Sequence, residues 1–177
     1  MGRFVGDLLC SEKFAYKQRS HLPCVDVKGW VRSLIISKKK HIKMEYFSIQ
    51  ELTYSYTAEK NGIKNTLTGV IVEHLHELIA FLNPLREAWG SAIKITSGYR
   101  CEELNRLVGG VRNSAHLTGY AADLYPTSGC FTQFVEFLKT YLSDKQFDQC
   151  IIESSGKSRW VHLSIEGNRR QLFTLVC

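Results

Sequence analysis

The stretch NSAHLTGYAADLYP (residues 113–126) contains two residues of the kinds that bind metal ions, His116 and Asp123. Zinc accepts an imidazole nitrogen or a carboxylate oxygen, and a catalytic zinc takes three protein ligands and leaves one position open for water. Gly119 and the two alanines at 121–122 keep the connection between them tight, so the two side chains can converge. A third ligand has to come from another part of the chain.

The best third candidate is His162, in the stretch RWVHLSIE (residues 159–166). This stretch is expected to form an alternating strand, in which Trp160 and His162 share one face. A single histidine on a strand face is more often structural than a ligand, but two histidines and one aspartate together favour a metal site. His74 and His76 compete poorly, because residues two apart on a helix point in different directions.

Helices and strands of mixed order would position these residues. Ser48 and Glu51 form a capping box that indicates the start of a folded domain. Apolar residues at steps of three and four predict a long helix over residues 69–89, which Pro84 should kink or restart with Asn83 as its cap. The pattern predicts further helices at 101–109 and 131–142, and strands at 92–98, 120–126, 147–154, 159–166 and 171–176. Without a regular strand–helix–strand rhythm, α+β is the favoured class.

The bulk composition is that of a globular protein. The chain has 177 residues, of which 44% are hydrophobic and 23% charged, and no apolar run approaches the roughly 20 residues that span a bilayer. We therefore expect no membrane insertion. The first 14 residues lack the apolar core of a signal peptide, and the six cysteines form no C-x-x-C pair. These features predict synthesis in the cytoplasm with reduced thiols.

Positive charge is concentrated at the N-terminus. Residues 1–44 hold ten of the 23 Lys and Arg residues but three of the 17 Asp and Glu residues. We interpret residues 1–43 as a basic, weakly structured extension and residues 44–177 as the folded domain. A basic arm can bind nucleic acid or an anionic cell wall, or it can be solvated without a partner. No nucleic-acid recognition motif accompanies it, which makes that partner the weaker expectation.

The stretch SGYRCEELNRLVGGVRNSAHLTGYAADL, followed by FDQCIIE and WVHLS, resembles the zinc D-Ala-D-Ala carboxypeptidase family, including its phage endolysin members. The family pattern S-x-H-x-x-G-x-A-x-D with a distant histidine is matched by Ser114, His116, Gly119, Ala121, Asp123 and His162. The likeness runs from about Phe47 to Ile165. It implies an α+β fold with a central antiparallel sheet flanked by helices, shared with the hedgehog signalling domain. It also implies one catalytic zinc bound by His116, Asp123 and His162.

The sequence departs from this family at the catalytic acid. Many members carry an acid three residues before the last histidine, where this chain has Arg159, which cannot act as a base. In other members the glutamate lies on the preceding strand, an arrangement that Glu153 fits. In a hairpin centred on residues 156–157, residues whose numbers sum to about 313 face each other, which places Glu153 near Trp160. The alternative is a surface carboxylate paired with Arg159 or Lys157.

The resemblance assigns chemical roles to two residues. Zinc would lower the pKa of a bound water, and Glu153 would accept its proton and return it to the leaving amine. Arg100 would stabilise the developing oxyanion or clamp a substrate carboxylate. The alternative for Arg100 is a structural ion pair with Glu102 or Glu103.

Three further residues are candidates for substrate binding. Ser114 would hydrogen-bond the substrate, or else cap the turn that holds His116. Tyr99 and Trp160 would line the cleft, although aromatic residues of this kind are more often part of the core.

The expected function is hydrolysis of stem peptides in bacterial peptidoglycan, as a D-Ala-D-Ala carboxypeptidase or as an L-Ala-D-amino-acid endopeptidase. Cytoplasmic synthesis with a cell-wall substrate suggests a phage or prophage lysin that a holin releases to the wall, acting as a monomer. The alternative is a catalytically inactive, zinc-stabilised binding module of the same fold. A glutamate that points away from the metal would favour that alternative.

Overall fold

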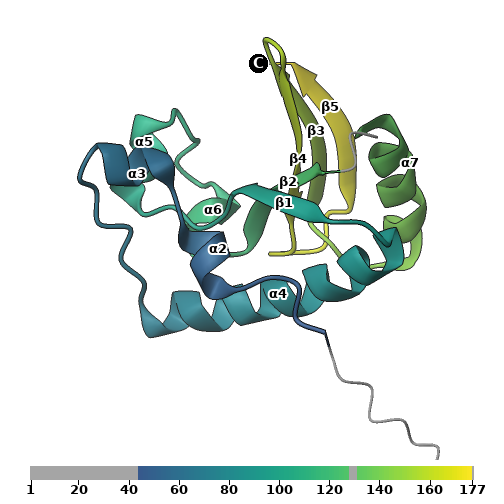
Figure 1. Cartoon of the computed structure of the whole chain (residues 1–177), viewed down its shortest axis with the longest axis horizontal. Helices are drawn as coiled ribbons and strands as arrows, with labels where there is room; N and C mark the ends of the chain where they lie inside the picture. The colour runs from purple at the N-terminus through teal and green to yellow at the C-terminus, as the bar shows by residue number, and fades with distance from the viewer. Residues whose placement is uncertain (1–43, 128–130, 177) are drawn as a thin grey trace, which may run out of the picture. The chain divides into compact units, whose positions relative to one another are not determined.

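The computed structural model describes residues 44–127 and 131–176, and the basic N-terminal extension predicted from the sequence lies outside them (Figure 1). The helices are α2 (Ile49–Thr53), α3 (Tyr56–Lys60), α4 (Gly69–Trp89), α5 (Glu102–Leu107), α6 (Ala115–Thr118) and α7 (Phe131–Tyr141), with a 3-10 turn η1 (Leu142–Asp144). The strands are β1 (Ile93–Ser97), β2 (Ala121–Pro126), β3 (Gln149–Ser155), β4 (Ser158–Ser164) and β5 (Gln171–Val176). None of the helices in these two ranges is long and apolar enough to cross a bilayer.

Helix α2 begins at the predicted capping box. The Ser48 hydroxyl accepts a hydrogen bond from the Glu51 backbone N–H at 3.2 Å, which satisfies one of the free donors of the first turn. Phe47 before the cap and Leu52 in the helix are both buried in the core. The predicted N-cap at Ser48 is therefore confirmed.

Helix α4 runs without interruption through Pro84, so the predicted restart at Asn83 is wrong. Leu82 and Leu85, on either side of Pro84, are completely buried, and their packing holds the helix together where proline removes one backbone hydrogen bond. Asn83 is buried as well, and its side-chain oxygen accepts a hydrogen bond from the Tyr46 N–H at 2.9 Å. This asparagine attaches the start of the folded region to α4 instead of capping a new helix.

The five strands form one sheet in the order β1-β2-β4-β3-β5. The pairs β1–β2, β2–β4 and β4–β3 are antiparallel, as the resemblance implies, but β5 is parallel to β3. The short segment 165–170 leaves β4 beside the start of β3 and passes to the far side of β3. Strand β5 must therefore run opposite to β4, and so in the same direction as β3. The expectation of an antiparallel sheet is wrong for this edge strand.

Asp148 holds this connection in place. It accepts hydrogen bonds from the Arg169 backbone N–H at 3.3 Å and from the Arg169 Nε at 2.8 Å. The Asp148 carbonyl accepts a further hydrogen bond from the Gln171 N–H at 2.9 Å, at the first residue of β5. The turn that leads into β5 is therefore bound to the residue directly before β3.

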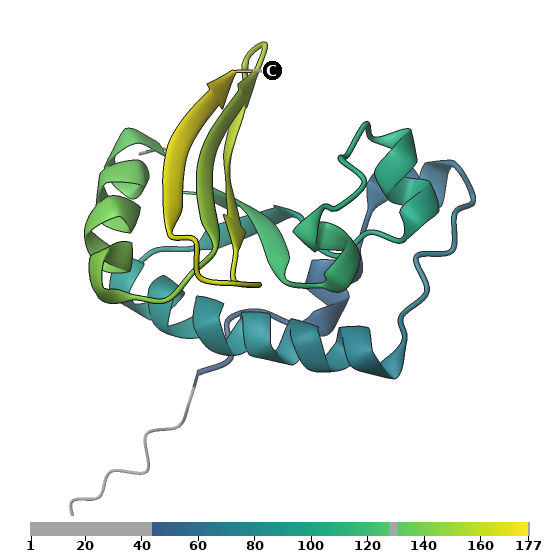
Figure 2. The same cartoon turned by 180° about the vertical axis from the view of Figure 1, so that it is seen from behind.

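The main core lies between one face of the sheet and helices α4 and α7. The sheet contributes Leu124, Val161 and Leu163, the last two from alternate positions of β4. The helices contribute leucines of α4 and the Phe134 and Leu138 side chains of α7. Figures 1 and 2 show α7 on one side of the sheet and α5 and α6 on the other, so the second face of the central strands is turned toward α6. The side chains that could do chemistry lie on that second face.

Candidate metal centre

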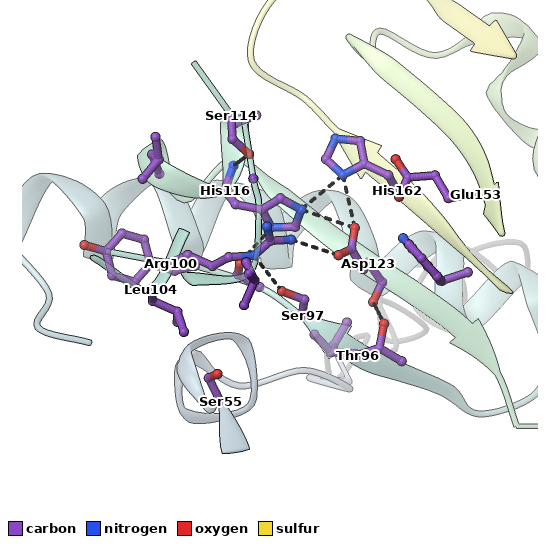
Figure 3. A pocket seen from close by; sticks show the side chains of 18 of the residues that line it. Ser55, Thr96, Ser97, Arg100, Leu104, Ser114, His116, Asp123, Glu153 and His162 are labelled. Carbon is purple, nitrogen blue, oxygen red and sulfur yellow. Dashed lines mark hydrogen bonds and ion pairs between the residues drawn. The ribbon is translucent and has the colours of Figure 1, made fainter. Parts of the chain in front are cut away.

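Three secondary-structure elements bring the three candidate ligands together (Figure 3). Asp123 on β2 lies directly opposite His162 on β4, and paired residues on antiparallel strands project to the same face. His116 comes from α6, a short helix where the sequence suggested only a turn. Gly119 ends this helix with φ of 82°, a conformation suited to glycine, and the chain then turns directly into β2.

The three ligand atoms form a nearly equilateral triangle. His116 Nε2 lies 3.2 Å from Asp123 Oδ1 and 3.1 Å from His162 Nδ1, and His162 Nδ1 lies 3.1 Å from Asp123 Oδ1. Ligand atoms about 2.0 Å from a tetrahedral zinc ion are separated by about 3.3 Å. The spacing of this donor set therefore fits three of the four corners of such a site.

The placement of protons on these groups also favours a metal site. His116 Nδ1 lies 2.7 Å from the Gly98 carbonyl oxygen, which can only accept, so Nδ1 carries the proton. In the neutral ring, Nε2 then presents a lone pair toward Asp123 Oδ1, which is also an acceptor, so these two atoms cannot hydrogen-bond each other. A cation at the centre of the triangle would be bound by these two lone pairs, and by that of His162 Nδ1 in the tautomer that carries its proton on Nε2. His116, Asp123 and His162 are also the group of His, Cys, Asp and Glu side chains in the described ranges that could hold a metal ion.

The surroundings keep two of the candidate ligands in the protonation states that bind a metal. Burial lowers the pKa of His116, which favours the neutral imidazole. Burial alone would raise the pKa of Asp123, but the neighbouring His116 and His162 lower it far more, so the carboxylate stays ionised. A neutral imidazole and an ionised carboxylate are the forms that bind a cation.

Glu153 lies on the same side of the sheet as this triangle. The predicted hairpin register is confirmed, because Glu153 is paired with Trp160 and Ile151 with His162. Residues two apart on a strand share a face, so Glu153 lies on the same face as Ile151 and its partner His162. We describe this spacing of two residues along the strand as one row. The side chain is half-buried, and burial together with the Asp123 carboxylate raises its pKa. Both features agree with a carboxylate close to the metal triangle.

Arg159 lies on the opposite face of the sheet. Its guanidinium carbon stands 4.6 Å from the centre of the Phe131 ring, at the start of α7. A residue three positions before His162 on a regular strand must point away from it, since successive side chains alternate. Within the described residues, Glu153 forms an ion pair neither with Arg159 nor with Lys157, so the surface-pair alternative is not found.

Arg100 contacts the site through a different partner from those the sequence suggested. Its Nη2 donates to Asp123 Oδ2 at 3.0 Å and its Nε to Ser97 Oγ at 2.9 Å. The alternative reading, an ion pair with Glu102 or Glu103, is absent from the described ranges. The guanidinium therefore lies against a candidate metal ligand and not against the neighbouring helix.

The three candidate substrate-binding residues all line the cleft above the triangle. Ser114 is also the N-cap of α6, where its hydroxyl accepts from the His116 N–H at 3.3 Å. Tyr99 is mostly buried, and its hydroxyl donates to the Thr66 carbonyl at 3.2 Å, a core role that the sequence left open. Trp160 is half-buried beside Glu153.

The cleft has a volume of about 1700 Å³ and extends well beyond the metal triangle. The sheet lines it with two carboxylates, Glu153 on β3 and Asp148 directly before that strand, and with apolar residues such as Ile151 and Trp160. The opposite wall has apolar residues that sequence reasoning did not single out. They are strongly exposed and come from the α2–α3 connection and the end of α5, namely Tyr54, Tyr56, Val108 and Val111. Exposure of large apolar side chains in the folded state is the signal that the sequence alone could not give.

Comparison with known protein families agrees with this geometry. The family model described as Peptidase M15 matches residues 45–164, about two-thirds of the chain. The chain therefore belongs to the peptidase M15 family, whose members are zinc-dependent. The five-stranded sheet with its helices is compatible with the fold of that family. None of the curated proteins compared with the chain matches it significantly. Family and site together support a zinc metallopeptidase, with the His116–Asp123–His162 cluster as the group that could bind the metal.

Proposed function

We propose that this metallopeptidase hydrolyses peptide bonds in the stem peptides of bacterial peptidoglycan, as a D-Ala-D-Ala carboxypeptidase or an L-Ala-D-amino-acid endopeptidase. The observation that carries a hydrolytic role is the position of Glu153. It lies one row from His162, on the same face of the sheet, in a cleft that also holds the three candidate ligands. A binding module would need the ligands but would have no use for a half-buried carboxylate there.

Each residue has a defined role in this proposal. His116, Asp123 and His162 hold one zinc ion, which when bound supplies a Lewis acid for the scissile carbonyl and activates water. Glu153 accepts the proton of the attacking water and returns it to the leaving amine. Burial raises the pKa of Glu153, which brings the carboxyl group closer to the proton affinity that this transfer needs.

The cleft supports a peptide substrate. Its volume of about 1700 Å³ exceeds the range of about 300–1,000 Å³ that is typical of small-molecule pockets. Its lining combines charged and apolar residues, and Ser114, Tyr99 and Trp160 are the residues we propose for substrate contact close to the metal. An extended peptide can reach the metal triangle and the apolar wall at the same time.

The biological setting is part of the same proposal. We propose a phage or prophage lysin that reaches the peptidoglycan after a holin has opened the membrane, and that acts as a monomer without nucleic acid. The fold would be the one that zinc D-Ala-D-Ala carboxypeptidases share with the hedgehog signalling domain.

Mass spectrometry of peptidoglycan digests tests this function. The unaltered chain is compared with Glu153→Gln and with the matched control Ser154→Ala, whose side chain points to the other face of β3. Glu153→Gln should bind zinc stoichiometrically and release fragments about 100- to 10,000-fold more slowly, because the amide cannot accept the proton. The control should release the same fragments as the unaltered chain, and the masses identify the bond that is cut.

Two outcomes would contradict the proposal. Equal hydrolysis by Glu153→Gln and by the unaltered chain would remove Glu153 from the mechanism. Stoichiometric zinc with no hydrolysis of any peptidoglycan preparation would favour the inactive binding module of the same fold.

A further inference from the structure

The four residues Ser97–Arg100, at the end of β1, contact two of the three candidate ligands. The Gly98 carbonyl holds the His116 ring through Nδ1 at 2.7 Å, and the Arg100 backbone N–H donates to the His116 carbonyl at 3.1 Å. A Cβ atom at position 98 would lie 2.1 Å from the Leu52 carbonyl oxygen, so this close packing admits only glycine. His116 is thus fixed by a backbone segment that is itself packed tightly on α2.

The Arg100 side chain extends this support to Asp123. Besides its bond to Asp123 Oδ2, the guanidinium donates to Ser97 Oγ at 2.9 Å and approaches Asn105 Oδ1 at 3.5 Å. Asn105 is 2% exposed and is itself held by its bond to the Val111 carbonyl at 2.9 Å. Figure 3 shows Arg100 reaching the aspartate from the side away from His162.

The two carboxylate oxygens of Asp123 therefore have separate partners. Oδ1 faces His116 Nε2 and His162 Nδ1, whereas Oδ2 is occupied by the guanidinium. The side chains of Arg100 and Asp123 are only 14% and 10% exposed, so water competes weakly for this bond. We propose that Arg100 is a positioning residue, which makes Asp123 bind the metal through Oδ1 alone and fixes the direction of that oxygen. This inference rests on the metal site proposed above.

This role differs measurably from stabilisation of an oxyanion. A residue that acts only on the transition state changes the rate of hydrolysis and leaves the affinity for the metal unchanged. A residue that orients a metal ligand changes the affinity for the metal before any substrate is present. Measurements without substrate therefore separate the two roles.

The experiment measures the dissociation constant for zinc by competition with a chromophoric chelator, in the full chain without substrate. Arg100→Met should weaken zinc binding by about 10- to 100-fold, the usual effect of losing a group that orients a ligand. Arg100→Lys should recover part of this loss, because an ammonium can reach Asp123 but cannot also bridge to Ser97 in the same plane. Arg106→Met, on the exposed side of α5, controls for the loss of one positive charge and should bind zinc normally.

A spectroscopic measurement accompanies the affinities. With saturating cobalt in place of zinc, Arg100→Met should show a changed visible absorption per bound ion, since Asp123 would be free to coordinate through either oxygen. A role that is structural in a general sense would lower the amount of folded protein without changing this spectrum. Circular dichroism confirms folding, and if Arg100→Met does not fold, Ser97→Ala removes one anchor of the guanidinium and should weaken zinc binding by a smaller factor.

Unchanged zinc affinity and an unchanged cobalt spectrum in folded Arg100→Met would overturn the assignment. Loss of hydrolysis alone in that variant would support a role on the transition state and also count against it. The zinc affinities and the cobalt spectra are measured without peptidoglycan. If the unaltered chain failed to hydrolyse peptidoglycan, the proposed function would be contradicted, but these two measurements would still test the role of Arg100.

Discussion

The centre and the edge of the sheet hold their functional residues in different ways. In the centre, Asp123 on β2 and His162 on β4 face each other across one register pair, and both are buried. Toward the edge, Glu153 on β3 is half-buried, and every residue of the neighbouring β5 is exposed. These two candidate ligands therefore lie in buried surroundings, and the candidate base lies where the sheet opens to solvent.

This difference follows from what each group has to do. Ligands of one ion must keep their spacing to a few tenths of an ångström, which buried hydrogen bonds such as that of Arg100 to Asp123 provide. A base that passes a proton from water to a leaving group needs access to both, and partial exposure allows it. Variants of the buried candidate ligands should therefore lose both metal and hydrolysis, and Glu153→Gln should lose hydrolysis but keep the metal. Variants of the exposed edge strand β5 should have little effect on either.

The largest expected effect is that of Asp123→Ala. Removing the carboxylate takes away one ligand and leaves Arg100 with an unpaired buried charge. Hydrolysis should fall by more than about 1000-fold, because the metal-dependent step is lost. Zinc content measured by atomic emission should fall below one ion per chain at the same time.

The matched comparison for this variant is Glu153→Gln, which should keep its zinc. If Asp123→Ala retained stoichiometric zinc and normal hydrolysis, the metal would have to be bound elsewhere, and the distinction between centre and edge would fail.

Much of this arrangement could be predicted from the sequence because its signals are local. The alternation in RWVHLSIE placed His162 and Trp160 on one face, and a turn at residues 156–157 fixed the register that pairs Glu153 with Trp160. A two-residue turn leaves almost no freedom in the register of a hairpin. The spacing from His116 to Asp123 likewise lies within one tight helix–strand connection.

The parts that could not be predicted depend on contacts between distant residues. Nothing local in residues 165–171 shows that the chain crosses the start of β3 and makes β5 parallel to it. Pro84 suggested a break in α4, but the leucines beside it pack into a core assembled from other elements. The bond from Arg100 to Asp123 was not foreseen for the same reason. Asp123 is 23 residues away, whereas Glu102 and Glu103, the partners in the alternative reading, are neighbours in sequence.

An effect of intermediate size, on stability, is expected at Asp148, which attaches the edge strand β5 to the rest of the sheet. Hydrogen bonds from Arg169 lower the pKa of Asp148, so its contribution to stability is present above the ordinary carboxyl pKa and is lost as the pH falls through the lowered value. At pH 7, Asp148→Asn should lower the free energy of unfolding by about 1–2 kcal/mol, a modest value because 57% of the Arg169 side chain is exposed. Urea unfolding from pH 7 to pH 3 measures this difference.

The pH dependence is the decisive part of that measurement. The difference in the free energy of unfolding between the unaltered chain and Asp148→Asn should decrease below about pH 4. Protonation of Asp148 then removes the charge that the variant already lacks. A difference that stays constant over this pH range would mean that Asp148 acts through packing alone. The ion pair with Arg169 would then not be what attaches the connection to β5 to the start of β3.

The smallest effect is expected at the edge strand itself. Val176 on β5 is 80% exposed, whereas Val161 on β4 is completely buried, although both are valines in strands of one sheet. Val176→Ala should change the free energy of unfolding by less than about 0.5 kcal/mol, because almost no apolar contact is lost. Val161→Ala should cost about 2 kcal/mol, because it leaves a cavity beneath the strand that carries His162. Urea unfolding of the two variants under the same conditions compares them directly. A large loss of stability in Val176→Ala would show that the edge strand β5 is covered in solution. The contrast between a buried centre and an exposed edge would then not hold.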